Sequence, residues 1–314
     1  MTILWLAALL TVLAACGATG TGTGTDTDST GAQTSTAASA ASDADASTAA
    51  STAGGASAST AASTAGSVSA SAGGAATGNL PDLGGRAILI GTGSTYPPFE
   101  SLDPQTNEIV GFDVDLMAEI ARLINLKPEF QTTSFETIFE ALAAKQFDAV
   151  MSAVTITEER KQKVDFSDPY VSIGQQVVAL KTNDQIKRYE DLKTNNFQVG
   201  VQRGTTGEQA ALTKAGVPEA NVKRYDDIAA AFSDLNNNAI DAIVADGPTV
   251  ANYTSQEQYR DKMAVVGEAF TTEDYGIAVQ KGDTELLNAI NAVLAQLQQS
   301  GKIDELKQKY EIKE

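Results

Sequence analysis

The chain has 314 residues, no histidine, one cysteine and a net charge of −18. Without histidine, catalysis by a Ser-His-Asp or Cys-His set is excluded, and the commonest neutral metal ligand is missing. The lone Cys16 cannot form an internal disulfide, and the acidic composition disfavours nucleic acid as a partner. We expect neither a metal site nor a cofactor, and a fold that depends on its hydrophobic core.

The N-terminal segment, residues 1–15, has the pattern of a signal peptide. The apolar run from Ile3 to Ala15 is too short to span a bilayer but long enough for the core of such a peptide. It ends in Leu13-Ala-Ala-Cys16, which resembles the lipobox of bacterial lipoproteins. That resemblance implies cleavage before Cys16, lipidation of Cys16 and an extracytoplasmic position on the cell membrane.

A low-complexity segment, residues 16–80, begins at the cysteine. It consists almost entirely of Ala, Ser, Thr and Gly, with no aromatic residue. Such a composition cannot bury enough apolar surface to offset the entropy of ordering the chain. The segment is therefore predicted to be a disordered tether.

The next part of the chain alternates between strand and helix patterns. Strands are expected at 87–91, 128–132 and 147–151, and helices at 111–126 and 135–146. Thr157 followed by Glu158 and Glu159 predicts one more short helix, which carries Arg160. This alternation predicts a parallel sheet with right-handed crossovers, in which ligands bind beyond the carboxyl ends of the strands.

A second block of the same kind lies between two extended segments, 174–181 and 275–280. Its expected elements are strands at 198–202, 221–225, 239–245 and 263–266, and helices at 208–215, at 228–235 and from Thr249 onward. Two helices, 284–298 and 302–310, are expected to end the chain and to pack on the first block. The pattern predicts an α/β fold of two lobes joined by two hinge strands: 81–178 plus 276–314 form lobe 1, and 179–275 form lobe 2.

Arg160 is the first candidate for ligand binding. Its planar guanidinium, one turn into a short helix and close to Ser152 and Thr155, is suited to hold a carboxylate with two parallel hydrogen bonds. The alternative is an ordinary ion pair with Asp165 or with a surface glutamate.

Seven motifs in a fixed order point to one family. They are Tyr96-Pro-Pro-Phe-Glu100, Gly111-Phe-Asp-Val-Asp115, Phe147-Asp-Ala-Val-Met151, Thr155-Ile-Thr-Glu-Glu-Arg160, Val164-Asp-Phe-Ser-Asp-Pro-Tyr170, Val199-Gly-Val-Gln-Arg-Gly-Thr-Thr-Gly207 and Asp241-Ala-Ile-Val-Ala-Asp246. Over residues 87–310 the chain resembles the family 3 solute-binding proteins of polar amino acid ABC importers, which include the histidine- and glutamine-binding proteins. The resemblance implies the two-lobed type II periplasmic-binding-protein fold, with a mainly parallel sheet flanked by helices in each lobe. It also implies a monomeric receptor that passes an amino acid to a membrane permease.

The resemblance implies a role for each residue of the site. Arg160 would hold the α-carboxylate of the ligand, together with the N–H of Thr155 and with Thr206 at a helix N-terminus. The α-ammonium group would be held by the hydroxyl of Thr155, the carbonyl of Ala153 and the carboxylate of Asp246.

Four more residues complete the predicted site. Tyr96 and Phe135 would enclose the ligand side chain, and Ser152 and Gln202 would line the same cleft. Each of these assignments has a structural alternative: Asp246 in a turn often caps the next helix, and lone aromatic residues are more often part of a core. Thr205 and Thr206 would likewise serve as helix caps.

Two positions bear on which amino acid side chain the site accepts. Many relatives carry an acidic residue three positions before Tyr96, where this chain has Gly93, which disfavours lysine and arginine as ligands. Arg203 either reaches an acidic ligand or points to solvent. The sequence favours glutamine or glutamate.

Two other functions remain open at this point. Some dehydratases of cyclic carboxylic acids share the fold and its carboxylate-binding arginine, and a ligand-sensing domain for a signalling partner is also compatible with it. Such an enzyme would need a buried acid or base in the cleft. Since Arg160 and Asp246 together suit a zwitterion, we expect a binding protein and no enzyme.

Overall fold

The computed structural model describes residues 80–313. The predicted signal peptide, Cys16 and the tether as far as residue 79 lie outside these residues. Within them, no helix combines the length and the apolar character needed to cross a membrane.

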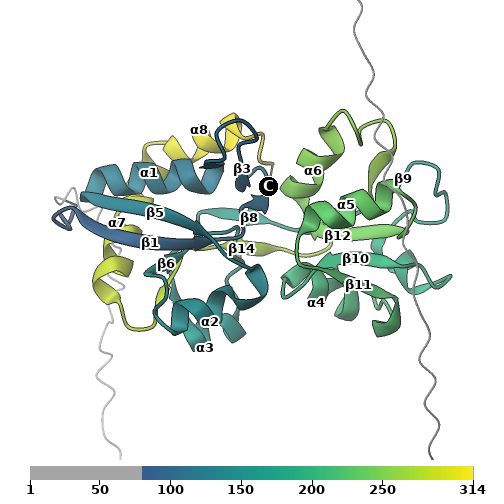
Figure 1. Ribbon diagram of the computed structural model, residues 1–314, viewed down its shortest axis with the longest axis horizontal. Helices are drawn as coiled ribbons and strands as arrows, with labels where there is room; N and C mark the ends of the chain where they lie inside the picture. The colour runs from purple at the N-terminus through teal and green to yellow at the C-terminus, as the bar shows by residue number, and fades with distance from the viewer. Residues whose placement is uncertain (1–79, 314) are drawn as a thin grey trace, which may run out of the picture. The chain divides into compact units, whose positions relative to one another are not determined.

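The first of two five-stranded sheets is built from both ends of the folded part (Figure 1). Its strand order is β5 (Leu126–Thr132), β1 (Arg86–Thr92), β6 (Ala149–Val150), β15 (Ala278–Gln280) and β7 (Val164–Phe166). β1 runs parallel to β5 and β6, whereas β15 runs antiparallel to β6 and β7.

The second sheet repeats this arrangement. Its strand order is β11 (Val222–Tyr225), β10 (Val199–Gln202), β12 (Ala242–Asp246), β9 (Gln175–Leu180) and β13 (Met263–Val266). β10 runs parallel to β11 and β12, and β9 runs antiparallel to β12 and β13. Each sheet is therefore mixed. Beside a parallel core of three strands lies one strand of opposite direction, β15 or β9, and the edge strand next to it, β7 or β13, again runs in the direction of the core.

The boundary that the sequence predicts after residue 178 falls within a strand. β9 pairs with β12 and β13 over its whole length, from Gln175 to Leu180. All of β9 therefore belongs to the second sheet.

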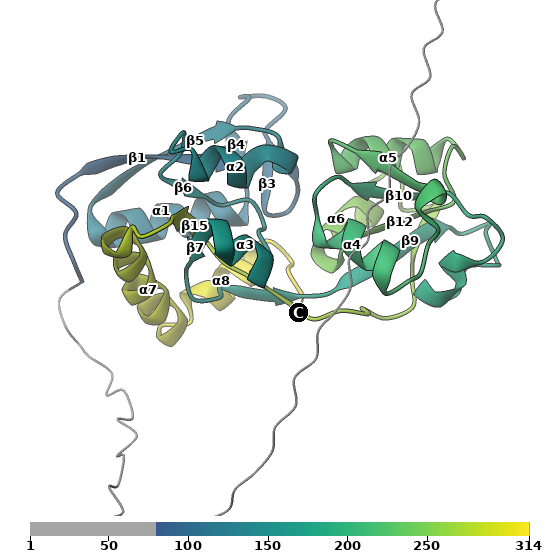
Figure 2. The same cartoon turned by 90° about the horizontal axis from the view of Figure 1, so that it is seen from below.

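Two short strands link the parts of the chain that carry the two sheets. β8 (Val171–Ile173) and β14 (Glu273–Tyr275) pair with each other in antiparallel orientation and run between the two groups of elements (Figure 1). The sequence predicts the connecting segments a few residues later, at 174–181 and 275–280, but most of those residues form β9 and β15, which are strands of the two sheets. Figure 2 shows the same two groups from below. A small antiparallel meander is formed by β2 (Thr95–Tyr96), β3 (Glu100–Leu102) and β4 (Ile109–Val110).

Helices cover both sheets. The α-helices are α1 (Phe112–Ile124), α2 (Ile138–Ala143), α3 (Glu158–Lys163), α4 (Thr206–Thr213), α5 (Ile228–Asn236), α6 (Gly247–Ser255), α7 (Thr284–Gln299) and α8 (Lys302–Lys309). The 3-10 helices are η1 (Phe135–Thr137), η2 (Tyr189–Lys193) and η3 (Glu219–Asn221).

The C-terminal helices pack beside α1, as the sequence predicts (Figure 1). Leu116 and Ile120 of α1 share a buried cluster with Ile290 and Val293 of α7. The amphipathic pattern of α7 therefore finds its apolar partner on the first sheet's side of the molecule.

The element between β5 and β6 is shorter than expected. The predicted helix at 135–146 is a 3-10 turn followed by α2, and Lys145 has a left-handed φ of 61° just after it. The strand predicted at 147–151 pairs only at Ala149 and Val150.

Candidate functional site

A narrow cavity lies at the carboxyl ends of β1, β6, β10 and β12. All nine residues that the sequence predicts as ligand contacts line it: Tyr96, Phe135, Ser152, Ala153, Thr155, Arg160, Gln202, Thr206 and Asp246. Gly93, Thr95, Glu100 and Thr205 line it too. Parallel strands end at the same edge of a sheet, and for this reason residues so distant in the sequence meet there. The role of each residue toward a ligand stays a prediction.

Arg160 is held by backbone oxygens. Its Nη1 donates to the carbonyl of Thr155 at 2.7 Å, and its Nη2 donates to the carbonyl of Gly204 at 3.2 Å. Within residues 80–313 no carboxylate forms an ion pair with it, and the proposed partner Asp165 pairs instead with Lys281 at 2.6 Å. Burial lowers the pKa of Arg160 to about 10, against the opposing effect of the negative charges of Asp246 and Glu273. The guanidinium thus keeps N–H donors and an uncompensated charge for a ligand.

Thr157 explains how Arg160 is placed. The hydroxyl of Thr157 accepts the backbone N–H of Arg160 at 3.2 Å and so caps α3, as the sequence predicts. On its inner side, the guanidinium carbon lies 5.5 Å from the ring centroid of Phe135 and 4.7 Å from that of Phe139. These are cation–π distances, so Phe135 also serves to position Arg160.

Asp246, at the end of β12 in the second sheet, lines the same cavity as Arg160. It occupies the N-cap position of α6, but its carboxylate makes no capping hydrogen bond. One carboxylate oxygen instead accepts from the side-chain amide of Gln175, and the other from the hydroxyl of Tyr275. Burial, followed by the negative charge of Glu273, raises the pKa of Asp246 to about 6. The structure therefore supports the cavity-facing interpretation of Asp246 over the helix cap.

Thr205 and Thr206 divide the two roles that the sequence left open. The hydroxyl of Thr205 accepts the backbone N–H of Glu208 at 3.1 Å and caps α4. The hydroxyl of Thr206 is instead 3.2 Å from that of Thr155. Of these two threonines, only Thr205 caps a helix with its side chain.

Glu100 is the residue that sequence reasoning missed. It is 1% exposed and lines the cavity; its Oε1 accepts the hydroxyl of Ser152 at 2.7 Å, while its Oε2 has no partner among the described residues. Burial and then the charge of Asp113 raise the pKa of Glu100 well above its ordinary value. Tyr96 and Glu100 stand in one sequence motif, and the structure pairs them directly across β2 and β3, so both side chains lie on one face.

Gln202, the last residue of β10, and the next residue, Arg203, have different surroundings. Arg203 pairs with Asp226 at 3.2 Å and with Glu136 at 3.5 Å, and it does not line the cavity. Gln202 is buried in the cavity wall and donates to the carbonyl of Asp226 at 3.3 Å. The structure thus places Arg203 among surface carboxylates, away from the cavity.

The fold and this cavity define a two-lobed α/β binding protein of type II, with a cation and a carboxylate in one buried site. Residues 88–313 match the bacterial extracellular solute-binding proteins, family 3, and the chain belongs to this family. The family that the motifs predict is thereby confirmed. Among the residues that the structure describes, no group of Asp, Glu, Cys and His side chains is arranged to hold a metal ion.

Two curated relatives are themselves named as amino acid-binding proteins. A probable histidine-binding protein of Neisseria gonorrhoeae is 37% identical over 230 residues, which cover 73% of this chain and 85% of that protein. The ABC transporter glutamine-binding protein of Bacillus subtilis (strain 168) is 34% identical over 226 residues, covering 71% and 80%.

Two solved structures are similar in fold and in sequence. An ancestral arginine-binding protein bound to glutamine has a TM-score of 0.66 and 41% identity, covering 71% of this chain and 97% of that chain. An ancestral amino acid-binding protein described as a precursor of cyclohexadienyl dehydratase has a TM-score of 0.66 and 40% identity, covering 71% and 95%.

Proposed function

We propose that this protein is a lipid-anchored extracytoplasmic receptor that binds a free L-amino acid between its lobes and delivers it to an ABC importer. The observation that supports this most is that Arg160 and Asp246 line the same cavity. An α-amino acid carries a carboxylate and an ammonium group on one carbon, and the cavity offers one opposite charge for each.

The two charges come from different sheets, which couples binding to closure. Arg160 belongs to α3, beside the first sheet, and Asp246 ends β12 of the second. A ligand that satisfies both holds the two lobes together, whereas a ligand lacking one charge leaves a buried group uncompensated. The antiparallel pair β8 and β14 would act as the hinge.

Glu100 narrows the choice of cargo. A buried carboxyl group with an unpartnered oxygen in the cavity wall is best satisfied by a hydrogen-bond donor on the ligand side chain. Glutamine and arginine carry such donors, and the ancestral relative bound to glutamine is named an arginine-binding protein. A glutamate side chain would instead add a negative charge to a cavity that already holds Glu100 and Asp246. Of the two amino acids that the sequence favours, we therefore propose glutamine. Arginine, which Gly93 disfavours, becomes the other candidate because Glu100 supplies an acidic group that the sequence analysis did not include.

The lipid anchor and the importer are supported by the sequence and by the comparisons with known proteins. The apolar run before Cys16 and the lipobox-like sequence support lipidation of Cys16. Delivery to an ABC importer is supported by membership of the solute-binding family and by the name of the Bacillus subtilis relative.

A thermal-shift screen of the full-length protein tests the proposal. The twenty L-amino acids would be compared with their des-amino and α-keto analogues and with cyclic carboxylic acids. A ligand that binds only the folded state raises the melting temperature by mass action. We expect a shift with glutamine or arginine and little or none with analogues that lack the ammonium group. No shift with any amino acid would refute the receptor function.

A dehydratase is the second candidate function, and Glu100 is the observation that favours it. A buried carboxyl group of raised pKa in a cavity with a carboxylate-binding arginine could act as a general acid. A shift confined to cyclic acids without an ammonium group, together with turnover of those acids, would establish the enzyme instead.

A further inference from the structure

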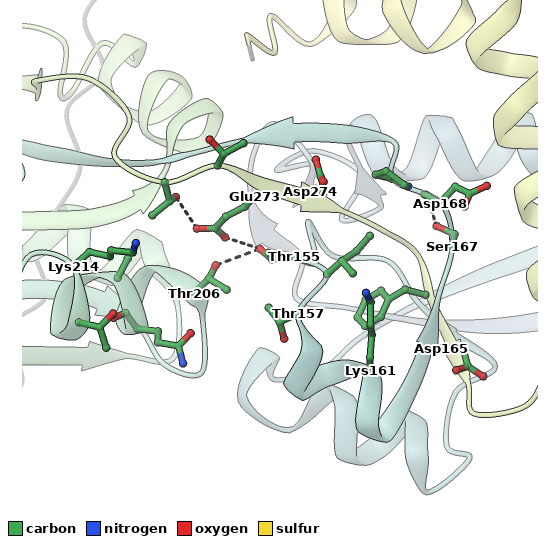
Figure 3. A pocket seen from close by; sticks show the side chains of 18 of the residues that line it. Thr155, Thr157, Lys161, Asp165, Ser167, Asp168, Thr206, Lys214, Glu273 and Asp274 are labelled. Atoms are coloured by element: carbon green, nitrogen blue, oxygen red, sulfur yellow. Dashed lines mark hydrogen bonds between the residues drawn. The ribbon is translucent and has the colours of Figure 1, made fainter. Parts of the chain in front are cut away.

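Glu273 lies just behind the cavity, on the hinge strand β14. Figure 3 shows its carboxylate pointing toward Thr155 and Thr206, in a surface groove that these residues also line. Thr155 and Thr206 line the inner cavity as well, but Glu273 does not. The two threonines thus form a thin wall, with the cavity on one side and Glu273 on the other.

Two hydroxyl groups converge on this carboxylate. Thr155 donates to Oε2 of Glu273 at 3.0 Å, and Thr271 donates to Oε1 at 2.8 Å. A carboxylate only accepts hydrogen bonds, and each hydroxyl has a single proton to give. The proton of Thr155 therefore points away from the cavity, toward Glu273.

The direction of the remaining hydrogen bonds follows from that proton. The hydroxyl oxygens of Thr155 and Thr206 are 3.2 Å apart, and by geometry alone either could donate. Since the proton of Thr155 is given to Glu273, Thr206 must be the donor. The side-chain amide of Gln175 donates in turn to the hydroxyl of Thr206 at 3.3 Å. One chain of donors thus runs from Gln175 through Thr206 and Thr155 to Glu273.

This chain decides what the wall offers to a ligand. Both threonine protons are used within the wall, so the two oxygens present only lone pairs to the cavity. Lone pairs suit an ammonium group and not a carboxylate. We propose that Glu273 is a positioning residue, which orients the hydroxyls of Thr155 and Thr206 as acceptors for the α-ammonium group of the cargo. The inference rests on the proposed function, and it assigns any contact of Thr206 with the ligand carboxylate to its backbone N–H.

The charge of Glu273 also reaches both charged groups of the cavity. After Asp246, it is the next charge that favours the cationic form of Arg160, and it opposes the ionisation of Asp246 by raising the pKa of that carboxyl group. The carboxylate therefore acts on the ligand-facing groups although it lies outside the cavity. Negative charge behind a wall of acceptors attracts a cationic group placed on the other side.

Isothermal titration of the full-length protein tests this role. The probes are L-glutamine and L-arginine, each with its des-amino analogue, 4-carbamoylbutanoic acid or 5-guanidinopentanoic acid. The variants are Glu273→Ala and Glu273→Gln, with Asp274→Ala as the matched control. Asp274 is the next residue of the same strand, and its carboxylate accepts from Ser172 at 2.5 Å, away from the cavity wall.

For Glu273→Ala we expect affinity for the amino acids to fall about tenfold, and affinity for the des-amino analogues to fall less than about threefold. Glu273→Gln should lose less affinity than Glu273→Ala, because an amide oxygen can still accept the Thr155 hydroxyl although the negative charge is removed. Asp274→Ala should behave like the unaltered protein. Equal losses for the amino acids and their analogues, or equal effects of Glu273→Ala and Asp274→Ala, would overturn the inference.

A double-mutant cycle covers the case in which Glu273→Ala disturbs the hinge. If Glu273 acts through the hydroxyl, then in a Thr155→Val background the further change Glu273→Ala should alter affinity less than about twofold. A full additional loss would show that Glu273 acts by another route. Failure of the unaltered protein to bind any amino acid would refute the receptor function itself, which separates that outcome from failure of the Glu273 role.

Discussion

The carboxylate of Asp113, at the start of α1, holds the backbone of Ala153 at the edge of the cavity. Its Oδ2 accepts the N–H of Ala153 at 2.9 Å, and its Oδ1 accepts the hydroxyl of Tyr170 at 3.0 Å. Ala153 has a left-handed φ of 48°, a conformation that costs a residue with a Cβ about 1–2 kcal/mol. Asp113 is fully buried, so its two hydrogen bonds stabilise a strained backbone that places Ser152 and Ala153 in the wall of the cavity.

Substitution of Asp113 by Asn should therefore affect both folding and binding. The amide can accept only one of the two donors, and its NH2 group then faces the other. We expect the free energy of unfolding to fall by about 1–3 kcal/mol, and the affinity for the cargo to fall with it. Urea denaturation and calorimetry measure the two effects. Asp115→Asn is the control, since Asp115 contacts Lys309 and Tyr310 at the surface; equal effects of both changes would contradict the role of Asp113.

Removal of the Arg160 guanidinium should strongly weaken amino acid binding. Truncating one partner of a buried, hydrogen-bonded charge pair costs about 2–5 kcal/mol, so Arg160→Ala should weaken binding at least about 30-fold. Arg160→Lys should recover only part of this loss, because an ammonium group cannot form two parallel hydrogen bonds to a carboxylate. Titration calorimetry gives both values. Arg203→Ala, which removes a surface arginine outside the cavity, should bind normally; binding by Arg160→Ala within about threefold of the unaltered protein would refute the site.

Asp246 should make the stability of the unliganded protein depend on pH. Its pKa is about 6 in the folded protein and 3.8 without the fold, so between these values the folded state binds more protons. Stability must therefore fall as the pH rises from about 4 to 6, by about 1–3 kcal/mol from this group. Asp113, whose pKa burial raises to about 7, acts in the same direction.

Substitution of Asp246 by Asn isolates its share of that dependence. Urea denaturation at pH 4.5 and pH 7 should show a smaller loss of stability for Asp246→Asn than for the unaltered protein. The asparagine can still accept from Tyr275, so the fold should persist. The same pH dependence in both proteins would mean that Asp246 keeps an ordinary pKa.

Neutralising Glu100 should change which cargo is preferred. A guanidinium placed beside Glu100 favours the ionised form of this buried carboxyl group and then attracts it, whereas a neutral amide does not, and this difference is lost in Glu100→Gln. We expect affinity for arginine to fall at least about tenfold relative to affinity for glutamine. Competition calorimetry with the two amino acids measures the ratio. Glu108→Gln, an exposed acid between β3 and β4, is the control; an unchanged ratio in Glu100→Gln would remove Glu100 from the side-chain pocket.

Gly111 should be essential for folding. It precedes α1 with a φ of 143°, and a Cβ at this position would lie 2.1 Å from the carbonyl oxygen of Phe99. Because the contact is with backbone, Gly111→Ala should destabilise the fold by several kcal/mol, here about 3 kcal/mol or more. Gly84→Ala is the control: Gly84 also has a positive φ, of 66°, but a Cβ there meets nothing within 4 Å, so about 1 kcal/mol is expected. Thermal unfolding that treats the two variants alike would contradict the close approach.

Much of the architecture could be predicted from local sequence. Strand β13 has the predicted bounds, and Thr157 caps α3 as its residue type and the following glutamates indicate. All nine predicted site residues line one cavity, because each belongs to a motif at a strand end or a helix start. Periodicity, capping and turn chemistry depend on neighbours within a few residues, and a single sequence contains that information.

The partners of charged and polar side chains depended on the tertiary structure. Asp165 is only five residues from Arg160 in the sequence, yet it forms its ion pair with Lys281, and the guanidinium of Arg160 lines the cavity without a carboxylate partner among the described residues. Glu273 reaches Thr155 only because β14 crosses the molecule, and Glu100 enters the cavity wall only because β3 folds back on β2. The sequence by itself determined the family, the order of most elements and nine residues of the cavity wall, since these follow from local patterns and motifs. Which carboxylate meets which donor was decided by the packing of distant segments, because a hydrogen bond or ion pair forms only within a few ångströms and no local pattern encodes such a meeting.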